Sequence, residues 1–300
     1  MMPAPVVVFV YNRADHARIT LNCLRENVLA DKSDLYIYCD NAKNEKAQEG
    51  VDAVRAMVDD FAKNSGFLSV TVIKAEQNKG LAASIIGGAG EVLDKYGRII
   101  VVEDDLTTSK DFLTYMNNAL DFYENNEKIW SISGYTFPLK SLRSYPHDIY
   151  MSPRGCSWGW ATWKNRFDKV DWEVSDFEEF IRDSARIKHF NEGGPDMTDM
   201  LSRQVHGKIN SWAIRWCYQE SKENMFTVYP KESRVRNIGC DNSGTNCVDS
   251  NLYDTTLISG SSSCTFENLM PEAKIMREFR SMYDYSRLGS IKRKWLRLFI

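Results

Sequence analysis

Three adjacent carboxylates, Glu103, Asp104 and Asp105, follow an apolar run that ends at Val102. Carboxylates in a row repel one another and lose hydration beside a buried strand, so a positive charge should compensate them. Mg²⁺ and Mn²⁺ take hard oxygen ligands and commonly share such sites with substrate phosphates. The triplet therefore predicts a site for a divalent cation and a nucleotide diphosphate. The alternative is a solvated acidic turn that caps a helix beginning near Ser109.

Polar residues also follow three other runs that resemble strands. They are Tyr11, Asn12 and Arg13 after the first run, Asp40 and Asn41 after the second, and Asn78 and Lys79 after the third. Such side chains can contact a base, a ribose hydroxyl or a phosphate, and a helix N-terminus after Lys79 would favour an anion. Each segment alone is typical of a cap or a turn. Together they predict one ligand crevice with the acidic triplet.

The elements that must position these residues alternate along the first part of the chain. Strands are expected at 6–11, 35–39, 69–74, 98–102 and 129–133, separated by helical stripes that include 17–28, 51–61, 81–96 and 112–123. This alternation predicts a mainly parallel α/β sheet with helices on both faces, in which 98–102 is a central strand. Ligands of such sheets bind outside the carboxyl ends of the strands, where the triplet lies.

From about residue 138 the alternation is lost and aromatic residues become frequent. Trp158, Trp160 and Trp163 lie close together, and a second aromatic cluster spans 212–218. Sugars present apolar C–H faces that stack on aromatic rings, so Trp158 and Trp160 are expected to face a substrate. The alternative is that these rings pack the second part of the chain onto the sheet.

Composition limits the class of protein. The 300 residues, 43% of them hydrophobic, can bury a large core, and a net charge of −3 gives no overall field for nucleic acid. The seven cysteines include no C-x-x-C pair, so we expect reduced, cytosolic thiols. The beginning of the chain does not resemble an export signal, and no apolar run approaches the ~20 residues of a membrane span. These features predict a cytoplasmic protein that does not bind nucleic acid.

The C-terminal segment 292–300 combines four basic residues with large apolar side chains. That composition suits an anionic membrane surface, so it predicts peripheral contact with the inner face of the cell membrane. A solvated terminal helix is the alternative.

The order Val-Tyr-Asn-Arg, Tyr-Cys-Asp-Asn, Asn-Lys-Gly-Leu and Val-Val-Glu-Asp-Asp-Leu, within residues 5–135, resembles the nucleotide-binding half of the GT-A glycosyltransferases. It is most similar to bacterial family 2-like enzymes and to the N-acetylglucosaminyltransferase I group, which carries the same Glu-Asp-Asp. The resemblance implies a GT-A, Rossmann-like sheet with an irregular, aromatic-rich acceptor half. It also implies inverting transfer of a hexosyl or N-acetylhexosaminyl group from a nucleotide-sugar donor, here expected to be UDP-linked. The expected acceptor is a glycan or a lipid-linked glycan, as in bacterial surface polysaccharide synthesis.

Residue roles carried over by position follow the same resemblance. It implies that Asp40 contacts the base, that Glu103 and Asp104 hold the ribose or sugar of the donor, and that Asp105 ligates Mn²⁺ or Mg²⁺. It divides the chain into a nucleotide-sugar-binding half at 1–137, an acceptor-binding half at 138–270 of the same domain, and a basic amphipathic tail at 271–300.

The residue that would remove a proton from the acceptor is less clearly marked. The N-acetylglucosaminyltransferase I group has an aspartate between tryptophans, but the segment 212–216 has none. Among Asp199, Asp171, Glu173 and Asp241, Asp199 is preferred because it precedes the aromatic segment in a polar stretch. The turn-rich segment 237–246 is expected to close over a bound donor as a lid.

Two other functions compete with sugar transfer. A sugar-phosphate nucleotidyltransferase should carry a glycine- and arginine-rich phosphate loop after the first strand, and residues 12–15 are not one. A non-catalytic sugar-binding protein on the same fold stays open while the base is unidentified.

Overall fold

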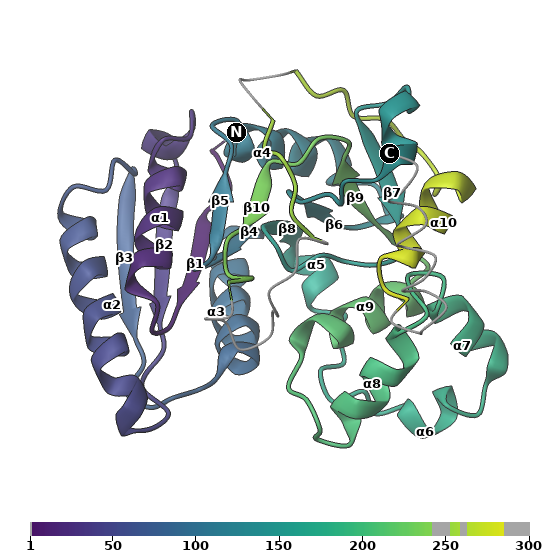
Figure 1. The fold of residues 1–300 in the computed structure, drawn as a ribbon, viewed down its shortest axis with the longest axis horizontal. Helices are drawn as coiled ribbons and strands as arrows, with labels where there is room; N and C mark the ends of the chain where they lie inside the picture. Colours follow the sequence, from purple (N-terminus) through teal and green to yellow (C-terminus); the bar gives the residue numbers. More distant parts are fainter. Residues whose placement is uncertain (1, 242–252, 259–262, 285–300) are drawn as a thin grey trace.

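The computed structural model describes residues 2–241, 253–258 and 263–284. An eight-stranded sheet with the order β3-β2-β1-β4-β8-β6-β9-β7 crosses this part of the chain (Figure 1). Its strands are β1 (Val6–Val10), β2 (Asp34–Cys39), β3 (Ser69–Lys74), β4 (Arg98–Glu103), β6 (Ile129–Ser133), β7 (Ile149–Ser152), β8 (Trp160–Trp163) and β9 (Phe226–Pro230). A separate two-stranded ladder joins β5 (Leu106–Thr108) to β10 (Val235–Asn237).

The helices cover both faces of the large sheet. They are α1 (Ala14–Arg25), α2 (Glu45–Lys63), α3 (Leu81–Tyr96), α4 (Phe112–Tyr123), α5 (Lys164–Phe167), α6 (Phe177–Phe180), α7 (Ser184–Phe190), α8 (Met197–Val205), α9 (Trp212–Lys222) and α10 (Ala273–Ser281), with 3₁₀ turns η1 (Ala30–Lys32) and η2 (Lys140–Ser144). Apolar side chains of α1, α2, α4 and α10 share one core cluster, and those of α3 and α9 share another. The two clusters lie on opposite faces because successive strand residues point to opposite sides.

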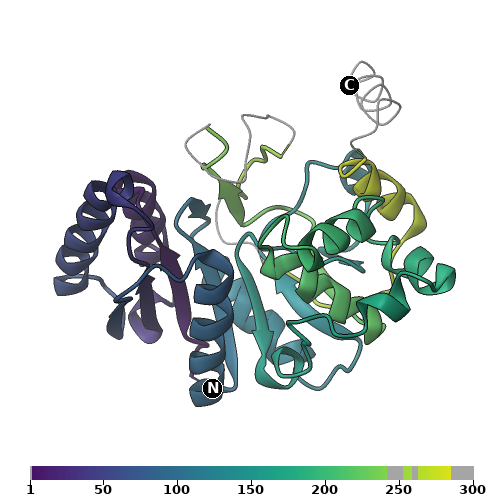
Figure 2. The same cartoon turned by 90° about the horizontal axis from the view of Figure 1, so that it is seen from below.

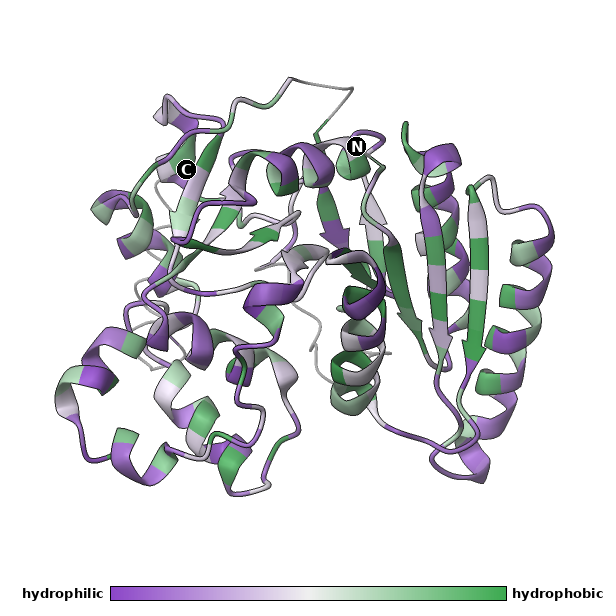
Figure 3. Cartoon of the chain, turned by 180° about the vertical axis from the view of Figure 1, so that it is seen from behind, coloured by the Kyte–Doolittle hydropathy of each residue, from purple (hydrophilic) through white to green (hydrophobic). Residues whose placement is uncertain are grey.

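The strand β1 shows how the sequence builds both cores at once. Val6, Val8 and Val10 belong to the first cluster, and Val7 and Phe9 belong to the second. A fully apolar strand of this kind can pack only between two helical layers. Figure 3 shows the same pattern, with strands hydrophobic along most of their length and helices striped by hydrophilic residues.

The predicted mainly parallel sheet flanked by helices is confirmed. The strand β1 pairs in parallel with β2 and β4, and β2 pairs in parallel with β3. The predicted strands agree with the observed ones to within a residue at each end. Val28 was expected on the first helical stripe, but α1 ends at Arg25 and Val28 is 62% exposed.

The two predicted halves share one sheet. The strand β8, from the second half, lies between β4 and β6 of the first half and pairs antiparallel with both. The second half is also more regular than expected, since α6 to α9 pack around a third apolar cluster that includes Phe180, Phe190 and Tyr218. Figures 1 and 2 show these helices gathered on one side of the molecule.

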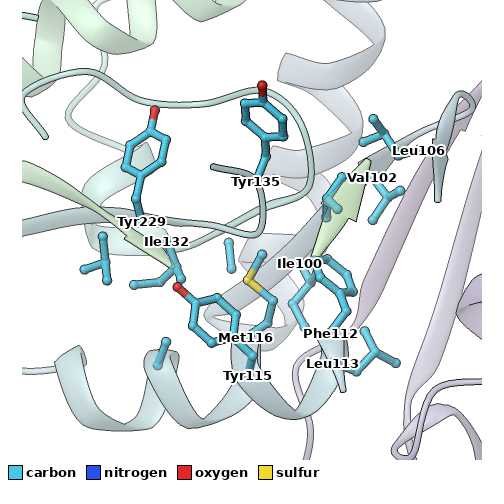
Figure 4. Close-up of a cluster of buried hydrophobic side chains, with 14 of the residues drawn as sticks. Ile100, Val102, Leu106, Phe112, Leu113, Tyr115, Met116, Ile132, Tyr135 and Tyr229 are labelled. Carbon is cyan, nitrogen blue, oxygen red and sulfur yellow. The ribbon is translucent and has the colours of Figure 1, made fainter. Parts of the chain in front are cut away.

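The end of β4 rests on a dense core. Figure 4 shows Ile100 and Val102 of β4 in one cluster with Phe112 and Met116 of α4. Leu106, the first residue of β5, is also fully buried in that cluster. The acidic triplet therefore lies between two buried anchors, Val102 and Leu106, which hold the intervening turn in place.

The predicted tail at 271–300 begins inside the fold. The helix α10 buries Ile275 and Phe279 in the first core cluster, and Glu278 accepts hydrogen bonds from the backbone of Lys140 and Ser141. Residues 285–300, which carry the basic segment, lie outside the described residues. Within the described ranges, no helix has the length and apolar character needed to cross a membrane.

The cysteine prediction needs one correction. Cys23, Cys39, Cys156, Cys217 and Cys264 are free, as expected. Cys240 is disulfide-bonded, so the prediction of reduced thiols throughout the chain is wrong at that position.

Candidate functional site

Arg13 joins the first strand exit to the acidic triplet. Its Nη2 donates to Asp104 Oδ1 at 2.6 Å and to Asp105 Oδ2 at 2.8 Å. The backbone N–H of Tyr11 also donates to Asp104 Oδ2, at 3.4 Å. Because β1 and β4 are parallel neighbours, their carboxyl ends bring these residues together, as the sequence predicted.

Burial and mutual repulsion perturb the triplet. Burial raises the pKa of Glu103 well above its ordinary value, and the charges of Asp105 and Asp104 raise it further. Burial also raises the pKa of Asp104, although the guanidinium of Arg13 opposes this shift. Burial lowers the pKa of Arg13, but the two aspartates outweigh it and the net shift is upward. One guanidinium thus pairs with two of the three carboxyl groups, and burial disfavours the charged forms of Glu103 and Asp104.

Thr20 fixes the backbone of the triplet, which the sequence did not indicate. Its buried Oγ1 donates to the carbonyl oxygen of Asp104 at 2.8 Å and accepts from the N–H of Leu106 at 3.2 Å. Thr20 lies on the buried face of α1 between Ala17 and Leu24. The sequence signal that could have indicated this role is a hydroxyl on the apolar stripe of a helix, because a buried polar group needs a hydrogen-bond partner.

The segment before residue 242 packs directly on the triplet. The N–H of Ile238 donates to the carbonyl oxygen of Asp105 at 2.8 Å. A Cβ atom at Gly239 would lie 2.1 Å from Asp105 Oδ2 and 2.8 Å from Arg13 Nη1, so any side chain there would require these groups or the segment to shift. His16 Nε2 and Asp241 Oδ2, 3.1 Å apart, connect the same segment to α1. Of the predicted lid at 237–246, residues 237–241 cover the triplet and the rest lies outside the described residues.

Asp40 organises the exit of β3. Its Oδ1 accepts from the N–H groups of Asn41 at 2.8 Å and Lys79 at 2.9 Å. Its Oδ2 accepts from Asn78 Nδ2 at 3.0 Å and from the N–H of Gly80 at 2.9 Å. A carboxylate has about four acceptor positions, so these four donors use its capacity. The predicted contact of Asp40 with a base stays a prediction, and the structure gives Asp40 a role in shaping the turn before α3.

The remaining predicted donor-site residues lie at the same edge. Asn78 and Lys79 are exposed on the turn that Asp40 holds, and Asn12 is exposed between β1 and α1. The hydroxyl of Tyr11 accepts from the N–H of Lys43 at 3.3 Å. The structure therefore brings the exits of β1, β2, β3 and β4 to one edge of the sheet, and contacts of these side chains with a donor stay predictions.

The two tryptophans expected to face a substrate have different surroundings. Trp160 is 1% exposed on β8 and packs against Trp212 at 5.0 Å and Trp216 at 5.4 Å between ring centroids. The prediction that it contacts a substrate is wrong, because β8 enters the sheet and its side chain fills the core. Trp158 is half-buried beside Tyr135, at 4.6 Å, so its predicted role stays open.

The four candidate bases lie in three different segments, since Asp171 and Glu173 share one surface turn. Asp199 is exposed on α8, a helix that packs against α7 and α9. Asp171 accepts from the backbone of Glu173 and Ser175 in a surface turn. Asp241 follows the Gly239 segment that covers the triplet. The choice of Asp199 stays a prediction, and Asp241 is the candidate whose own segment contacts the triplet, through Ile238 and Gly239.

A divalent cation fits this donor set in part. Asp104 and Asp105 direct hard oxygen atoms at one point, and Arg13 Nη2 already stands there as a cation. Among the described residues, no group of three or more His, Cys, Asp or Glu side chains is placed to hold a metal ion. Oxygen atoms from another molecule, such as a diphosphate, would have to complete the coordination.

Comparison with known proteins gives matches at the level of structure alone. No protein-family model matches the sequence, and no curated protein matches it. Residues 1–349 of TarS from S. aureus are 13% identical, with a TM-score of 0.41, over 76% of this chain and 60% of that one. The mannosyltransferase PcManGT from Pyrobaculum calidifontis, in complex with GDP-Man and Mn²⁺, is 13% identical, with a TM-score of 0.41, over 75% of this chain and 74% of that one. GalNAc-T7 with UDP, GalNAc and Mn²⁺ is 12% identical, with a TM-score of 0.48, over 79% of this chain and 44% of that one.

Proposed function

We propose that this chain is an inverting glycosyltransferase that moves a hexosyl or N-acetylhexosaminyl group from a UDP-linked donor to a glycan or lipid-linked glycan. The observation that carries the proposal is the meeting of four strand exits at one edge of the sheet, with Arg13 bound to Asp104 and Asp105 at its centre. The sequence likeness of the Glu-Asp-Asp run to the N-acetylglucosaminyltransferase I group supports the same reaction. Bacterial surface polysaccharide synthesis is the process that such an acceptor favours.

The donor would lie across the exits of β1 to β4. The turn shaped by Asp40 presents Asn78 and the exposed ammonium group of Lys79, which suits a nucleotide and its phosphates. Asp105, with Mn²⁺ or Mg²⁺ when bound, would hold the diphosphate, and the ion would stabilise the charge that develops on the leaving phosphate. Glu103 and Asp104 would bind hydroxyl groups of the ribose or the sugar.

The acceptor would approach from the side of Trp158. In an inverting transfer, the acceptor oxygen forms a bond to the anomeric carbon while the bond from that carbon to the diphosphate oxygen breaks. A carboxylate removes the proton of the acceptor hydroxyl as this occurs. Asp199 is the proposed base. Asp241 is a second candidate to be tested, because its segment contacts Asp105.

Thermal unfolding with a panel of nucleotide sugars, with and without Mn²⁺, tests the donor proposal. A selective ligand raises the Tm by mass action, and we expect a UDP-sugar with Mn²⁺ to give the largest rise. Incubation of that donor with candidate glycan acceptors should then yield UDP and a glycan longer by one sugar, with inverted anomeric configuration. Binding without turnover against any acceptor or water would favour the non-catalytic sugar-binding protein. No shift with any nucleotide sugar would overturn the proposal.

The base is tested by Asp199→Asn and Asp241→Asn, with Asp31→Asn as the exposed control. Loss of transfer with unchanged donor binding is expected for the variant that removes the base. If both variants keep full transfer, neither carboxylate is the base.

A further inference from the structure

We propose that Arg13 is the resident counter-ion of the acidic triplet, and that a divalent cation held by Asp105 would exchange with Arg13 at that carboxylate. The displaced guanidinium then binds the diphosphate of the donor. This inference rests on the proposed function and adds a regulation of cation entry to it.

The first argument is positional. A single nitrogen atom, Arg13 Nη2, bridges the two carboxylates at 2.6 and 2.8 Å. A divalent ion that bound Asp105 through Oδ2 would compete with Nη2 for that oxygen. On another side, the backbone at Gly239 is so near that a Cβ atom would stand 2.1 Å from the same oxygen. The guanidinium and the ion therefore compete for one place.

The second argument concerns the other amino group of Arg13. Its Nη1 is buried and has no hydrogen-bond partner among the described residues. A buried donor without a partner is costly, so the bridged arrangement leaves part of the guanidinium unsatisfied. Phosphate oxygens accept from both amino groups of an arginine in parallel, and a diphosphate would satisfy Nη1 and Nη2 together.

The third argument is the balance of charge. The carboxylates of Asp104 and Asp105 share one guanidinium, so this pair keeps a formal excess of negative charge without ligand. A divalent ion supplies more positive charge at the same point than Arg13 does, and it frees Arg13 for the negative diphosphate. Metal and donor should therefore bind with positive coupling, which by thermodynamic linkage acts equally in both directions.

Arg13 also has the freedom to move. It stands between β1 and α1, at the N-cap of the helix, where its side chain makes no cap hydrogen bond. Its side chain is 19% exposed, so part of it already lies at the surface. The contacts that it would leave are the two carboxylates and the Gly239 segment.

The test measures Mn²⁺ binding in the absence of nucleotide, by calorimetry or by the magnetic resonance signal of free Mn²⁺. Arg13→Gln should bind Mn²⁺ about tenfold more tightly than the unaltered protein, because its competitor is gone. Arg18→Gln is the matched control, since Arg18 lies on the same helix in an exposed pair with Asp15, and it should leave Mn²⁺ affinity unchanged. Equal or weaker Mn²⁺ binding by Arg13→Gln would overturn the exchange.

A second measurement keeps the inference testable if Arg13→Gln does not fold. In the unaltered protein, the Nε signal of Arg13 should shift on titration with Mg²⁺ and shift again on addition of UDP, while the signal of Arg18 stays fixed. An Arg13 signal that does not respond to Mg²⁺ would contradict displacement.

Failure of the exchange and failure of the proposed function give different results. If Mn²⁺ displaces Arg13 but no nucleotide sugar binds, the exchange stands and the transferase proposal fails. If a UDP-sugar binds and is turned over while Arg13→Gln leaves Mn²⁺ affinity unchanged, the transferase stands and the exchange fails.

Discussion

Gly80 donates its backbone N–H to Asp40 Oδ2 at 2.9 Å, so the residue that follows β2 also holds the residue that precedes α3. The φ of Gly80 is +74°, a conformation that side chains disfavour, and the hydrogen bond holds the chain there. The sheet edge that would bind a donor is thus shaped by a carboxylate from one strand exit acting on the backbone of another.

Asp40→Asn should loosen this turn. An amide presents hydrogens where the carboxylate accepted, so at least one backbone donor loses its partner, and the free energy of unfolding should fall by about 2–4 kcal/mol. Urea denaturation measures the loss, and nucleotide affinity should fall with it because the 78–80 turn is displaced. Asp31→Asn, at an exposed position, is the control. Unchanged stability in Asp40→Asn would show that the four hydrogen bonds contribute little.

Asp105→Asn should abolish the charge that a cation needs while keeping the shape of the side chain. We expect donor turnover to fall about 10²–10³-fold, as for removal of one group that stabilises a developing charge. An excess of chelator should have a similar effect on the unaltered protein. Asp15→Asn, on the surface of α1, is the control. Full activity in Asp105→Asn or in chelator would exclude the proposed metal site.

Gly239→Ala should separate the covering segment from the triplet. The new methyl group would meet Asp105 and Arg13 at less than 3 Å, so the segment must lift, and Mn²⁺ and donor affinity should change together. Gly87→Ala is a matched control, because Gly87 lies within α3 with open space around a Cβ atom, and it should stabilise the protein by about 0.5–1 kcal/mol. Identical ligand affinities in Gly239→Ala would mean that the segment is not part of the site.

Trp158 and Trp160 should respond differently to substitution. Trp160→Ala removes a buried ring from the core and should lower the free energy of unfolding by about 3–5 kcal/mol. Trp158→Ala should cost less stability and raise the KM for the acceptor about tenfold, equivalent to ~1.4 kcal/mol. Denaturation and steady-state kinetics on the two variants measure both effects. The acceptor role of Trp158 is wrong if its KM stays constant while stability falls.

Glu220 should make stability depend on pH. Burial raises the pKa of this fully buried carboxyl group on α9 well above its ordinary value of 4.5. The folded state then binds a proton that the unfolded state releases, so this contribution is complete below about pH 4.5 and is lost as pH rises through the folded pKa. Glu220→Gln should flatten that decline, as measured by denaturation from pH 4.5 to 9.

Glu223→Gln gives a control of opposite sign on the same helix. Although partial burial acts in the other direction, hydrogen bonds from Lys169 and Gln219 lower the pKa of Glu223. Its contribution is therefore present above its ordinary pKa and is lost as pH falls. If Glu220→Gln and the unaltered protein showed parallel pH curves, Glu220 would be ionised in the folded state.

The sheet could be predicted from the sequence because the central strands are runs of consecutive apolar residues. The five apolar residues in a row at 6–10 and the four at 99–102 can be buried on both sides only between two helical layers. The triplet and Arg13 were predicted to meet because the parallel strands that precede them end at one edge of the sheet. Periodicity could not place Trp160, because core and sugar-binding rings have the same composition and only strand pairing distinguishes them.

Long-range contacts explain the other differences. Gly239 lies against Asp105 although more than a hundred residues separate them in the sequence. A contact of this kind cannot be predicted from local sequence patterns. Cys240 was expected to be reduced because cysteine spacing showed no recognised motif, and a disulfide depends on where the fold brings the chain. The contact of Asp40 with a base stays a prediction, but its bonds to Asn78, Lys79 and Gly80 could not be predicted because that turn follows another strand.

The pairing of β5 with β10 affects how the protein is made. Thr107 Oγ1 donates to the carbonyl oxygen of Arg236, 129 positions later in the chain. At about 5–20 residues per second, a ribosome adds the second partner several seconds to tens of seconds after the first. During that interval β1 to β4 can already pair, while the acidic triplet has neither β10 nor Gly239 beside it. Arg13, which precedes the triplet in the chain, is available from the beginning, so it is the one partner in this site that can neutralise the nascent carboxylates before synthesis reaches residue 239.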